Sequence, residues 1–317
     1  MSLDTLIHLW RTDPNTAPNF PIWRTRPARP AQTRAFPEDM PASLREALAR
    51  RGISALYSHQ LEAWDYARAG RNIVLATGTA SGKTLAYNLP VMASLLAESS
   101  ARALYLFPTK ALSQDQLTVL QHLNLSTVNV PTSIYDGDTP QGQRSLIRRN
   151  ARIILSNPDM LHTGILPHHT NWADFFRGLR FVVIDEMHSY RGVFGSHIAN
   201  VIRRLKRVTA FYGAHPQFIL TYATIGNPRE LAGRLIEAPV ELIDQDGSSR
   251  GERHFLIYNP PVVDEALGLR KSSLMESVRL AGDIFSCGLQ SVIFARSRRT
   301  VEMLLTYLQE ARRGSGI

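Results

Sequence analysis

Residues 77–84 carry the strongest signal in the chain, and they read Thr77-Gly78-Thr79-Ala80-Ser81-Gly82-Lys83-Thr84. A short apolar run, 72–76, precedes them, and a segment with helical periodicity follows. A loop between a strand and the N-terminus of a helix points backbone N–H groups at phosphate. We therefore expect residues 79–84 to line a nucleotide site, with Lys83 reaching the β and γ phosphates and Thr84 offering its hydroxyl to Mg²⁺. Thr77 stands where the usual pattern, G-x-x-x-x-G-K-[ST], begins with glycine.

Short apolar runs alternate with helical segments beyond this loop. The expected strands are 72–76, 103–107, 132–135, 152–156, 181–184 and 217–222. Buried parallel strands read as continuous apolar runs, and Phe181-Val182-Val183-Ile184 is the clearest of them. This alternation predicts an α/β fold in which helices flank a parallel sheet.

Two adjacent carboxylates, Asp185 and Glu186, follow the clearest strand directly. The end of a parallel strand lies at the carboxyl edge of the sheet, where open α/β proteins bind ligands. We expect Asp185 to hold Mg²⁺ and Glu186 to activate the attacking water. Together with Lys83, they are the predicted catalytic residues.

The composition changes twice along the chain and suggests four regions. Residues 1–51 form a Pro- and Arg-rich extension, and 52–243 form the predicted nucleotide-binding domain. Residues 244–271 begin with a polar, Gly-containing stretch and are expected to be a linker. Residues 272–317 contain one expected helix, a strand at 290–295 and a second helix, which is too little for a complete α/β domain. They therefore suggest a truncated second domain.

Charge and cysteine content limit the class of protein further. The chain has 36 Lys and Arg against 27 Asp and Glu, a formal net charge of +9. A basic balance favours a polyanionic partner, although GC-rich codons would also explain the excess of arginine. Cys287 is the only cysteine, and neither a secretory signal nor a long apolar run is evident. These features predict a soluble cytoplasmic protein without membrane contact.

Further motifs make the chain resemble the first motor domain of superfamily 2 helicases of the DExH type. The matching segments, beside the two nucleotide motifs, are 56–60, 107–112, 156–161 and 222–224, where Tyr222-Ala223-Thr224 replaces the usual Ser-Ala-Thr. Within that superfamily, 76–84, 135–139 and 190–197 are similar to the MrfA-like, RecQ-related DNA-repair helicases. The resemblance implies a RecA-like domain, and 291–298 resembles the first strand of a second one.

The resemblance also implies roles for individual residues. Gln60 is expected to read the adenine of ATP, while His188, Ala223 and Thr224 are expected to couple the nucleotide site to movement. The predicted nucleic-acid contacts lie in loops or at helix starts, where hydroxyl, amide and cationic groups can bind phosphates without reading bases; they are Thr109, Lys110, Asn157 and Arg191.

The function implied by the resemblance is ATP-dependent 3′-to-5′ translocation on single-stranded DNA, with unwinding of partly duplex DNA and a role in DNA repair. ATP and Mg²⁺ are the expected cofactors. The family supplies an arginine finger from its second domain, so the chain as given is expected to bind nucleotide better than it hydrolyses it. Two alternatives stay open: an RNA helicase of the same superfamily, and a non-catalytic switch that binds ATP and nucleic acid.

Overall fold

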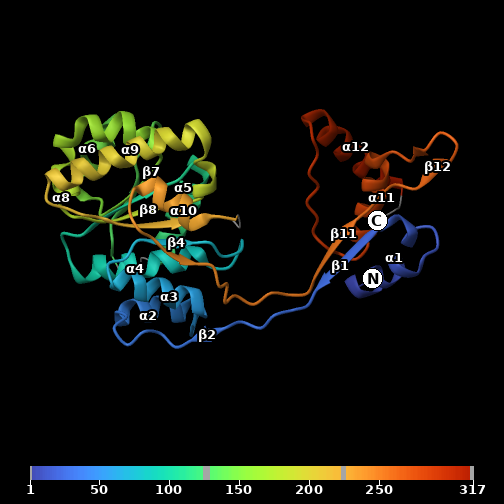
Figure 1. Ribbon diagram of the computed structural model, residues 1–317, viewed down its shortest axis with the longest axis horizontal. Coiled ribbons are helices and arrows are strands. Elements are labelled where there is room, and N and C mark those ends of the chain that lie inside the picture. Colours follow the sequence, from blue (N-terminus) through green and yellow to red (C-terminus); the bar gives the residue numbers. More distant parts are fainter. Residues whose placement is uncertain (1, 124–128, 223–225, 315–317) are drawn as a thin grey trace. The chain divides into compact units, whose positions relative to one another are not determined.

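The computed structural model describes residues 2–123, 129–222 and 226–314 (Figure 1). The chain forms two compact units. One is Pro30–Arg250, and the other joins Met1–Arg29 to Gly251–Ile317. The candidate site lies entirely in the first unit.

A seven-stranded parallel sheet forms the centre of the first unit. Its strands, in spatial order, are β10 (Glu241–Ile243), β4 (Ile73–Leu75), β9 (Gln217–Thr221), β8 (Leu179–Ile184), β5 (Arg102–Leu106), β7 (Ile153–Ser156) and β6 (Thr132–Ile134). The predicted α/β fold with a parallel sheet is confirmed, and all six expected strands belong to it. The strand β10 was not predicted, because Glu241 and Asp244 flank an apolar run of only two residues, Leu242-Ile243.

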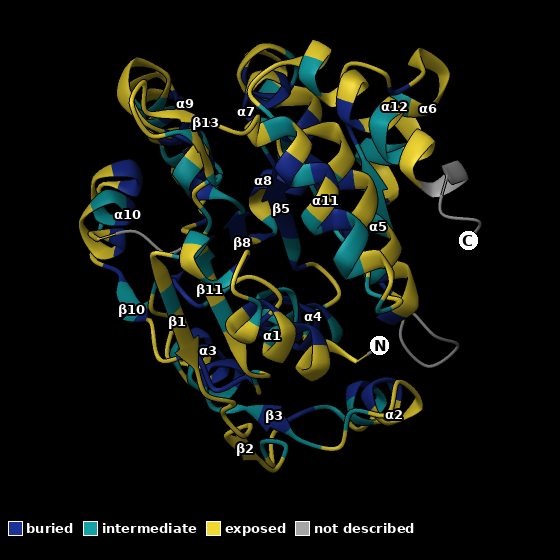
Figure 2. Ribbon diagram, turned by 90° about the vertical axis from the view of Figure 1, so that its right-hand side faces the viewer, coloured by how far each residue is buried: buried dark blue, intermediate teal, exposed yellow. Residues whose placement is uncertain are grey.

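Helices cover both faces of this sheet and bury its strands on both sides. The strand β5 shows the division: Ala103 and Tyr105 belong to one hydrophobic core, and Leu104 and Leu106 belong to the other. The first face carries α2 (Ala42–Arg50), α3 (Ser58–Arg68), α4 (Lys83–Ala97) and α5 (Lys110–Leu123). The second carries α8 (Ala173–Arg177), α9 (Gly192–Phe211) and α10 (Pro228–Ile236), with α6 (Gln141–Asn150) at its margin. Figure 1 shows the two layers, and Figure 2 shows β5 and β8 buried between them.

Smaller elements complete the first unit. The strand β2 (Thr33–Arg34) pairs in antiparallel fashion with β3 (Leu56–Tyr57), just before α3. The helix α7 (Pro158–Met160) leads into a π-helical turn, Leu161–Ile165, and then a 3-10 segment, Leu166–Trp172.

The second unit brings the N-terminal residues together with residues 251–317. The strand β1 (Ile22–Arg26) pairs with β11 (Arg253–Ile257), and α1 (Leu3–Thr12) contacts α11 (Ser273–Phe285). Trp10 Nε1 donates to Asp283 Oδ2 at 2.9 Å. The unit also contains a short 3-10 helix (Ala17–Asn19), β12 (Val262–Asp264), β13 (Leu269–Arg270) and α12 (Arg298–Gly314).

The structure divides the chain differently from the four expected regions. The first 29 residues belong with 251–317 rather than forming a separate extension, because β1 satisfies its backbone hydrogen bonds on β11 within the expected linker. The two helices expected within 272–317 are present as α11 and α12. The strand expected at 290–295 is not formed, since no described strand pairs with it, and Phe294 is 91% exposed there. No described helix is long and apolar enough to cross a bilayer.

Candidate active site

The phosphate loop connects β4 to α4 and is held in shape by its own side chains. The hydroxyls of Thr77 and Ser81, both buried, lie 2.8 Å apart and close the loop. Gly82 ends the loop at φ +83°, a conformation that glycine adopts without strain. A Cβ at Gly82 would also lie 2.6 Å from Gln60 Nε2. The threonine that replaces the first glycine of the usual pattern therefore has a structural role of its own.

The ammonium group of Lys83 lies over this loop. Its Nζ donates to the carbonyl oxygens of Thr77, at 2.9 Å, and Gly78, at 3.1 Å. Lys83 is the first residue of α4, so its side chain starts where the helix dipole also favours an anion. A bound phosphate would replace the two carbonyls as acceptor of this ammonium group.

The carboxylate pair lies two strands away from β4. Asp185 N donates to Leu106 O at 3.0 Å, which extends the pairing of β8 with β5 by one residue. Asp185 Oδ1 accepts from Glu186 N at 3.0 Å and from the hydroxyl of Thr221, at the end of the neighbouring β9. Glu186 N also lies 3.1 Å from that hydroxyl. Thr221 therefore contacts both members of the pair.

Glu186 has a backbone conformation that is uncommon outside glycine. Its φ is +51° and its ψ is 44°, in the left-handed region. Such a conformation costs about 1–3 kcal/mol and persists only where the surroundings impose it. Here its N–H donates to Asp185 Oδ1 and to the Thr221 hydroxyl, so two contacts of the site impose this conformation.

One cavity brings most of the predicted site residues together. It is lined by residues 79–84, Tyr87, Pro108, Thr109, Leu112, Asp185, Glu186, His188 and Ser189. The phosphate loop and both carboxylates thus face a common space at the carboxyl edge of the sheet. Among the described residues, no group of three or more His, Cys, Asp or Glu side chains could hold a metal. A Mg²⁺ ion would fit the oxygens of Thr84 and Asp185 together with phosphate oxygens, since Mg²⁺ is usually held by one or two carboxylates plus substrate phosphates.

A buried chain of hydrogen bonds runs from Asp185 into the first face of the sheet. The Tyr87 hydroxyl lies 3.4 Å from Asp185 Oδ2 and 3.1 Å from Gln116 Oε1 on α5. Gln116 Nε2 and the Tyr105 hydroxyl both donate to Asn88 Oδ1, at 3.1 and 2.9 Å. Burial raises the pKa of Tyr87 well above its ordinary value, so its hydroxyl stays protonated. The sequence reasoning missed Tyr87 and Thr221; the signal for Tyr87 was its position four residues after Lys83 on one helix.

The predicted coupling residue His188 contacts both the carboxylate pair and Tyr222, the residue that follows β9. Its Nδ1 lies 3.0 Å from Glu186 Oε2, outside good hydrogen-bond geometry, and its ring stands edge-on to Tyr222 at 6.2 Å. The Tyr222 hydroxyl accepts from Arg191 Nη2 at 2.7 Å. Tyr222 therefore has a hydroxyl contact even though it replaces the usual serine. The other two predicted coupling residues, Ala223 and Thr224, lie outside the described residues.

Gln60 lies beneath the phosphate loop rather than on the cavity wall. Only 3% of its surface is exposed. Its Oε1 accepts from Tyr57 N at 3.0 Å, and its Nε2 donates to Gly82 O at 3.0 Å. One end of the amide thus caps the N-terminus of α3, the other connects α3 to the loop, and the contact with adenine stays a prediction.

The predicted nucleic-acid contacts follow three neighbouring strands, β5, β7 and β8, and so lie along one sheet edge. Lys110 begins α5, and its Nζ lies 2.5 Å from Asp138 Oδ2, a hydrogen bond that raises the pKa of the lysine. Asn157 caps α7 by accepting from Met160 N at 2.7 Å. Thr109 is exposed and Arg191 is bound to Tyr222.

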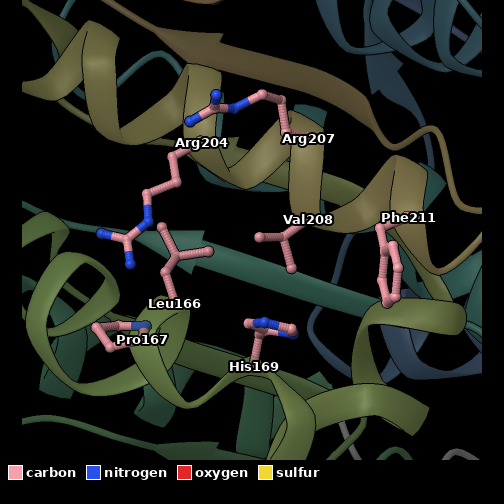
Figure 3. A pocket seen from close by; sticks show the side chains of 7 residues that line it. All are labelled: Leu166, Pro167, His169, Arg204, Arg207, Val208 and Phe211. Atoms are coloured by element: carbon pink, nitrogen blue, oxygen red, sulfur yellow. The ribbon is translucent and has the colours of Figure 1, made fainter.

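A separate hollow lies between α9 and the 3-10 segment (Figure 3). Arg204 and Arg207 reach over it from α9, and Leu166, Pro167 and His169 line its opposite side. None of the residues predicted for the site lines it. The chemistry expected from the sequence therefore belongs to the cavity beside the phosphate loop.

Comparison with known proteins agrees with this arrangement. A family model described as DEAD/DEAH box helicase matches residues 57–231, which include the phosphate loop and the carboxylate pair. The chain belongs to the DEAD/DEAH box helicase family. The predicted resemblance to DExH helicases is thereby confirmed.

Similar proteins within the family extend the comparison. YprA of Bacillus subtilis, an uncharacterised ATP-dependent helicase, is 48% identical over 91% of this chain and 39% of its own length. The ATP-dependent helicase HRQ1 of Saccharomyces cerevisiae is 39% identical over 78% of this chain and 24% of its own length. The crystal structure of the DUF1998 helicase MrfA bound to DNA and AMPPNP matches with a TM-score of 0.92 and 45% identity, over 98% of this chain and 43% of that one. The expected relation to MrfA-like helicases is confirmed, and the chain spans less than half of each of these relatives.

Proposed function

We propose that this chain is the ATP-binding motor part of an ATP-dependent DNA helicase. The observation that carries the proposal is the cavity in which Lys83 and Thr84 of the phosphate loop face Asp185 and Glu186. A phosphate loop and a carboxylate pair at the same edge of a parallel sheet are the two halves of an NTP-hydrolysing site.

Each residue has a distinct task in the proposed reaction. Lys83 exchanges its two carbonyl acceptors for oxygens of the β and γ phosphates. Thr84 and Asp185 would hold Mg²⁺, which would neutralise charge on the phosphates. Glu186 accepts a proton from the attacking water, and its fixed backbone keeps the carboxylate aimed.

DNA is the proposed polymer partner. Support comes from the similarity to MrfA, whose crystal structure is described as bound to DNA, and from the net charge of +9. We propose Thr109, Lys110, Asn157 and Arg191 as phosphate contacts along the sheet edge, and His188, Ala223 and Thr224 as coupling residues. Translocation from 3′ to 5′ and a role in DNA repair, which the sequence motifs imply by their resemblance to DNA-repair helicases, belong to the proposal.

We also propose that full activity needs a second RecA-like domain that begins near residue 272. The chain spans 39% of YprA and 43% of the MrfA chain, so both relatives contain further sequence. In phosphoryl-transfer enzymes an arginine finger raises turnover by a factor of about 10³–10⁵. The 317-residue chain is therefore expected to bind ATP with little hydrolysis.

Two measurements test this function. Fluorescent mant-ADP with Mg²⁺ should bind the 317-residue chain, and Lys83→Ala should weaken binding by about tenfold or more, because a charge-assisted contact is lost. Arg180→Ala is the matched control, since Arg180 pairs with Glu98 away from the cavity. Equal affinity of the wild type and Lys83→Ala would refute the site.

The second measurement is ATP hydrolysis by the longest native form with single-stranded DNA or RNA. We expect DNA to stimulate ATP hydrolysis, and we expect Glu186→Gln to lower the rate of hydrolysis by a factor of about 10²–10⁴. Stimulation by RNA alone would favour the RNA helicase. Binding without hydrolysis in the longest form would favour the non-catalytic switch.

A further inference from the structure

Residues 244–250, expected to begin a linker, fold back against the phosphate loop. Gly247 N donates to Nδ1 of the fully buried His59 at 3.2 Å, and Gly247 O accepts from Gln32 N at 2.8 Å. Ser58 N also donates to Gln32 O at 2.9 Å. The segment is thus fixed to the start of α3, directly beneath the loop.

An ion pair between Asp246 and Arg250 closes this segment; we call it the clasp. Asp246 is 9% exposed, and its Oδ2 pairs with Arg250 Nη2. Asp246 Oδ1 accepts from Ser248 N at 2.9 Å and from Ser248 Oγ at 2.7 Å. Burial opposes ionisation of Asp246, but the bonds from Ser248 and Arg250 outweigh it and hold the pKa below its ordinary range. The carboxylate is therefore charged and its orientation is set.

The clasp touches the phosphate loop at Gly78. A Cβ at that position would lie 2.6 Å from Arg250 Nη2 and 3.1 Å from Asp246 Oδ2. The carbonyl oxygen of the same residue accepts from Lys83 Nζ at 3.1 Å. Gly78 therefore lies between two cations, one that reaches the proposed phosphates and one that the clasp holds.

We propose that Arg250, fixed by Asp246, is a positioning residue for the phosphate loop and thereby for Lys83. The inference rests on the proposed nucleotide site and adds to it a part of the chain that lies outside the loop and the carboxylate pair. Because the guanidinium group packs directly on Gly78, it determines where the Gly78 carbonyl lies. That carbonyl oxygen accepts a hydrogen bond from the Lys83 ammonium group, so it sets where the ammonium group lies before phosphate binds.

The first test is the affinity of the 317-residue chain for mant-ADP with Mg²⁺. Arg250→Ala should weaken binding by about fivefold to tenfold, since it removes the guanidinium group that packs on Gly78 and is held there by its ion pair with Asp246. Arg250→Lys keeps the cation beside Asp246 and should recover part of the loss. Arg180→Ala, which removes an exposed Arg–Glu pair, should bind like the wild type.

The second test is a double-mutant cycle with Gly78→Ala. The added methyl group displaces the guanidinium from Gly78, so this substitution should weaken binding by about as much as Arg250→Ala. In the Arg250→Ala background the guanidinium is gone and the methyl group meets the end of the Asp246 side chain at 3.1 Å, a smaller displacement, so the second substitution should change affinity by less than about twofold. Equal effects of Gly78→Ala in both backgrounds would show that the two residues act independently and would overturn the inference.

A thermal melt without nucleotide separates positioning from a purely structural role. Positioning predicts loss of affinity in a chain that melts near the wild-type temperature. A lower melting temperature with affinity within twofold of wild type would overturn the inference. If the wild type and Arg180→Ala both fail to bind mant-ADP, the proposed nucleotide site itself is wrong, and the inference is overturned with it.

Discussion

Replacing Thr221 with valine tests whether one hydroxyl holds the carboxylate pair in place. Thr221 is fully buried; its hydroxyl donates to Asp185 Oδ1 and lies 3.1 Å from Glu186 N. Valine has nearly the same shape and makes neither bond. A hydrogen bond to an ionised group contributes about 1.5–3 kcal/mol and a neutral one about 1 kcal/mol. We therefore expect the free energy of unfolding to fall by about 2–4 kcal/mol.

Urea unfolding followed by circular dichroism measures this loss. Thr209→Val is the matched control, because Thr209 is also fully buried but its hydroxyl donates, among the described residues, to Lys206 O within its own helix α9. That control should lose less than about 1 kcal/mol. Thr221→Val should also weaken Mg²⁺-dependent binding of mant-ADP, since Asp185 loses a fixed donor. Equal losses of stability in the two variants, with unchanged Mg²⁺ dependence, would refute the bracing role of Thr221.

Three other predictions concern residues around the site. Burial lowers the pKa of His59, so below about pH 6.5 the unfolded chain binds more protons than the folded chain does. The free energy of unfolding therefore falls by up to about 1.4 kcal/mol per pH unit as the pH is lowered. His59→Asn should remove this pH dependence, measured by urea unfolding between pH 6.5 and 5. Gly178→Ala should cost about 2–3 kcal/mol, because its Cβ would meet a neighbouring backbone oxygen, whereas Gly142→Ala, on an open helix face, should stabilise by about 0.5–1 kcal/mol. Tyr222→Ser, which restores the residue usual in the family, should destabilise by about 3–5 kcal/mol, since it empties a buried site and leaves Arg191 without its hydroxyl acceptor.

Each of these predictions has a result that contradicts it. For His59, the contradicting result is a free energy of unfolding of His59→Asn that changes with pH in the same way as that of the wild type. For Gly178, it is a melting temperature equal to that of Gly142→Ala. For Tyr222, it is a serine variant as stable as the parent, which would mean that the ring fills no essential space.

The sequence predicted the central sheet and the two halves of the site because both depend on local patterns. A buried parallel strand such as 181–184 is apolar throughout, and a phosphate loop needs its glycine, lysine and threonine at fixed spacing. The end of such a strand also locates Asp185 and Glu186 at the ligand-binding edge. These inferences need no knowledge of distant contacts.

The remaining features depend on contacts between residues far apart in the chain. The pairing of β1 with β11 joins segments more than 200 residues apart, and no local pattern in 22–26 predicts this pairing. The return of 244–250 to the loop depends on His59, and the burial of Gln60 depends on Gly82. Composition alone made these segments resemble an extension and a linker.

The Tyr87 hydroxyl has one proton and two acceptors, Asp185 Oδ2 and Gln116 Oε1. Since burial keeps that proton in place, the hydroxyl can satisfy only one of them fully at a time. The proton therefore has to be shared between a carboxylate that lines the cavity and an amide on α5, the helix that begins at Lys110. A change in the acceptor strength of one of these two groups changes how firmly the hydroxyl is held by the other.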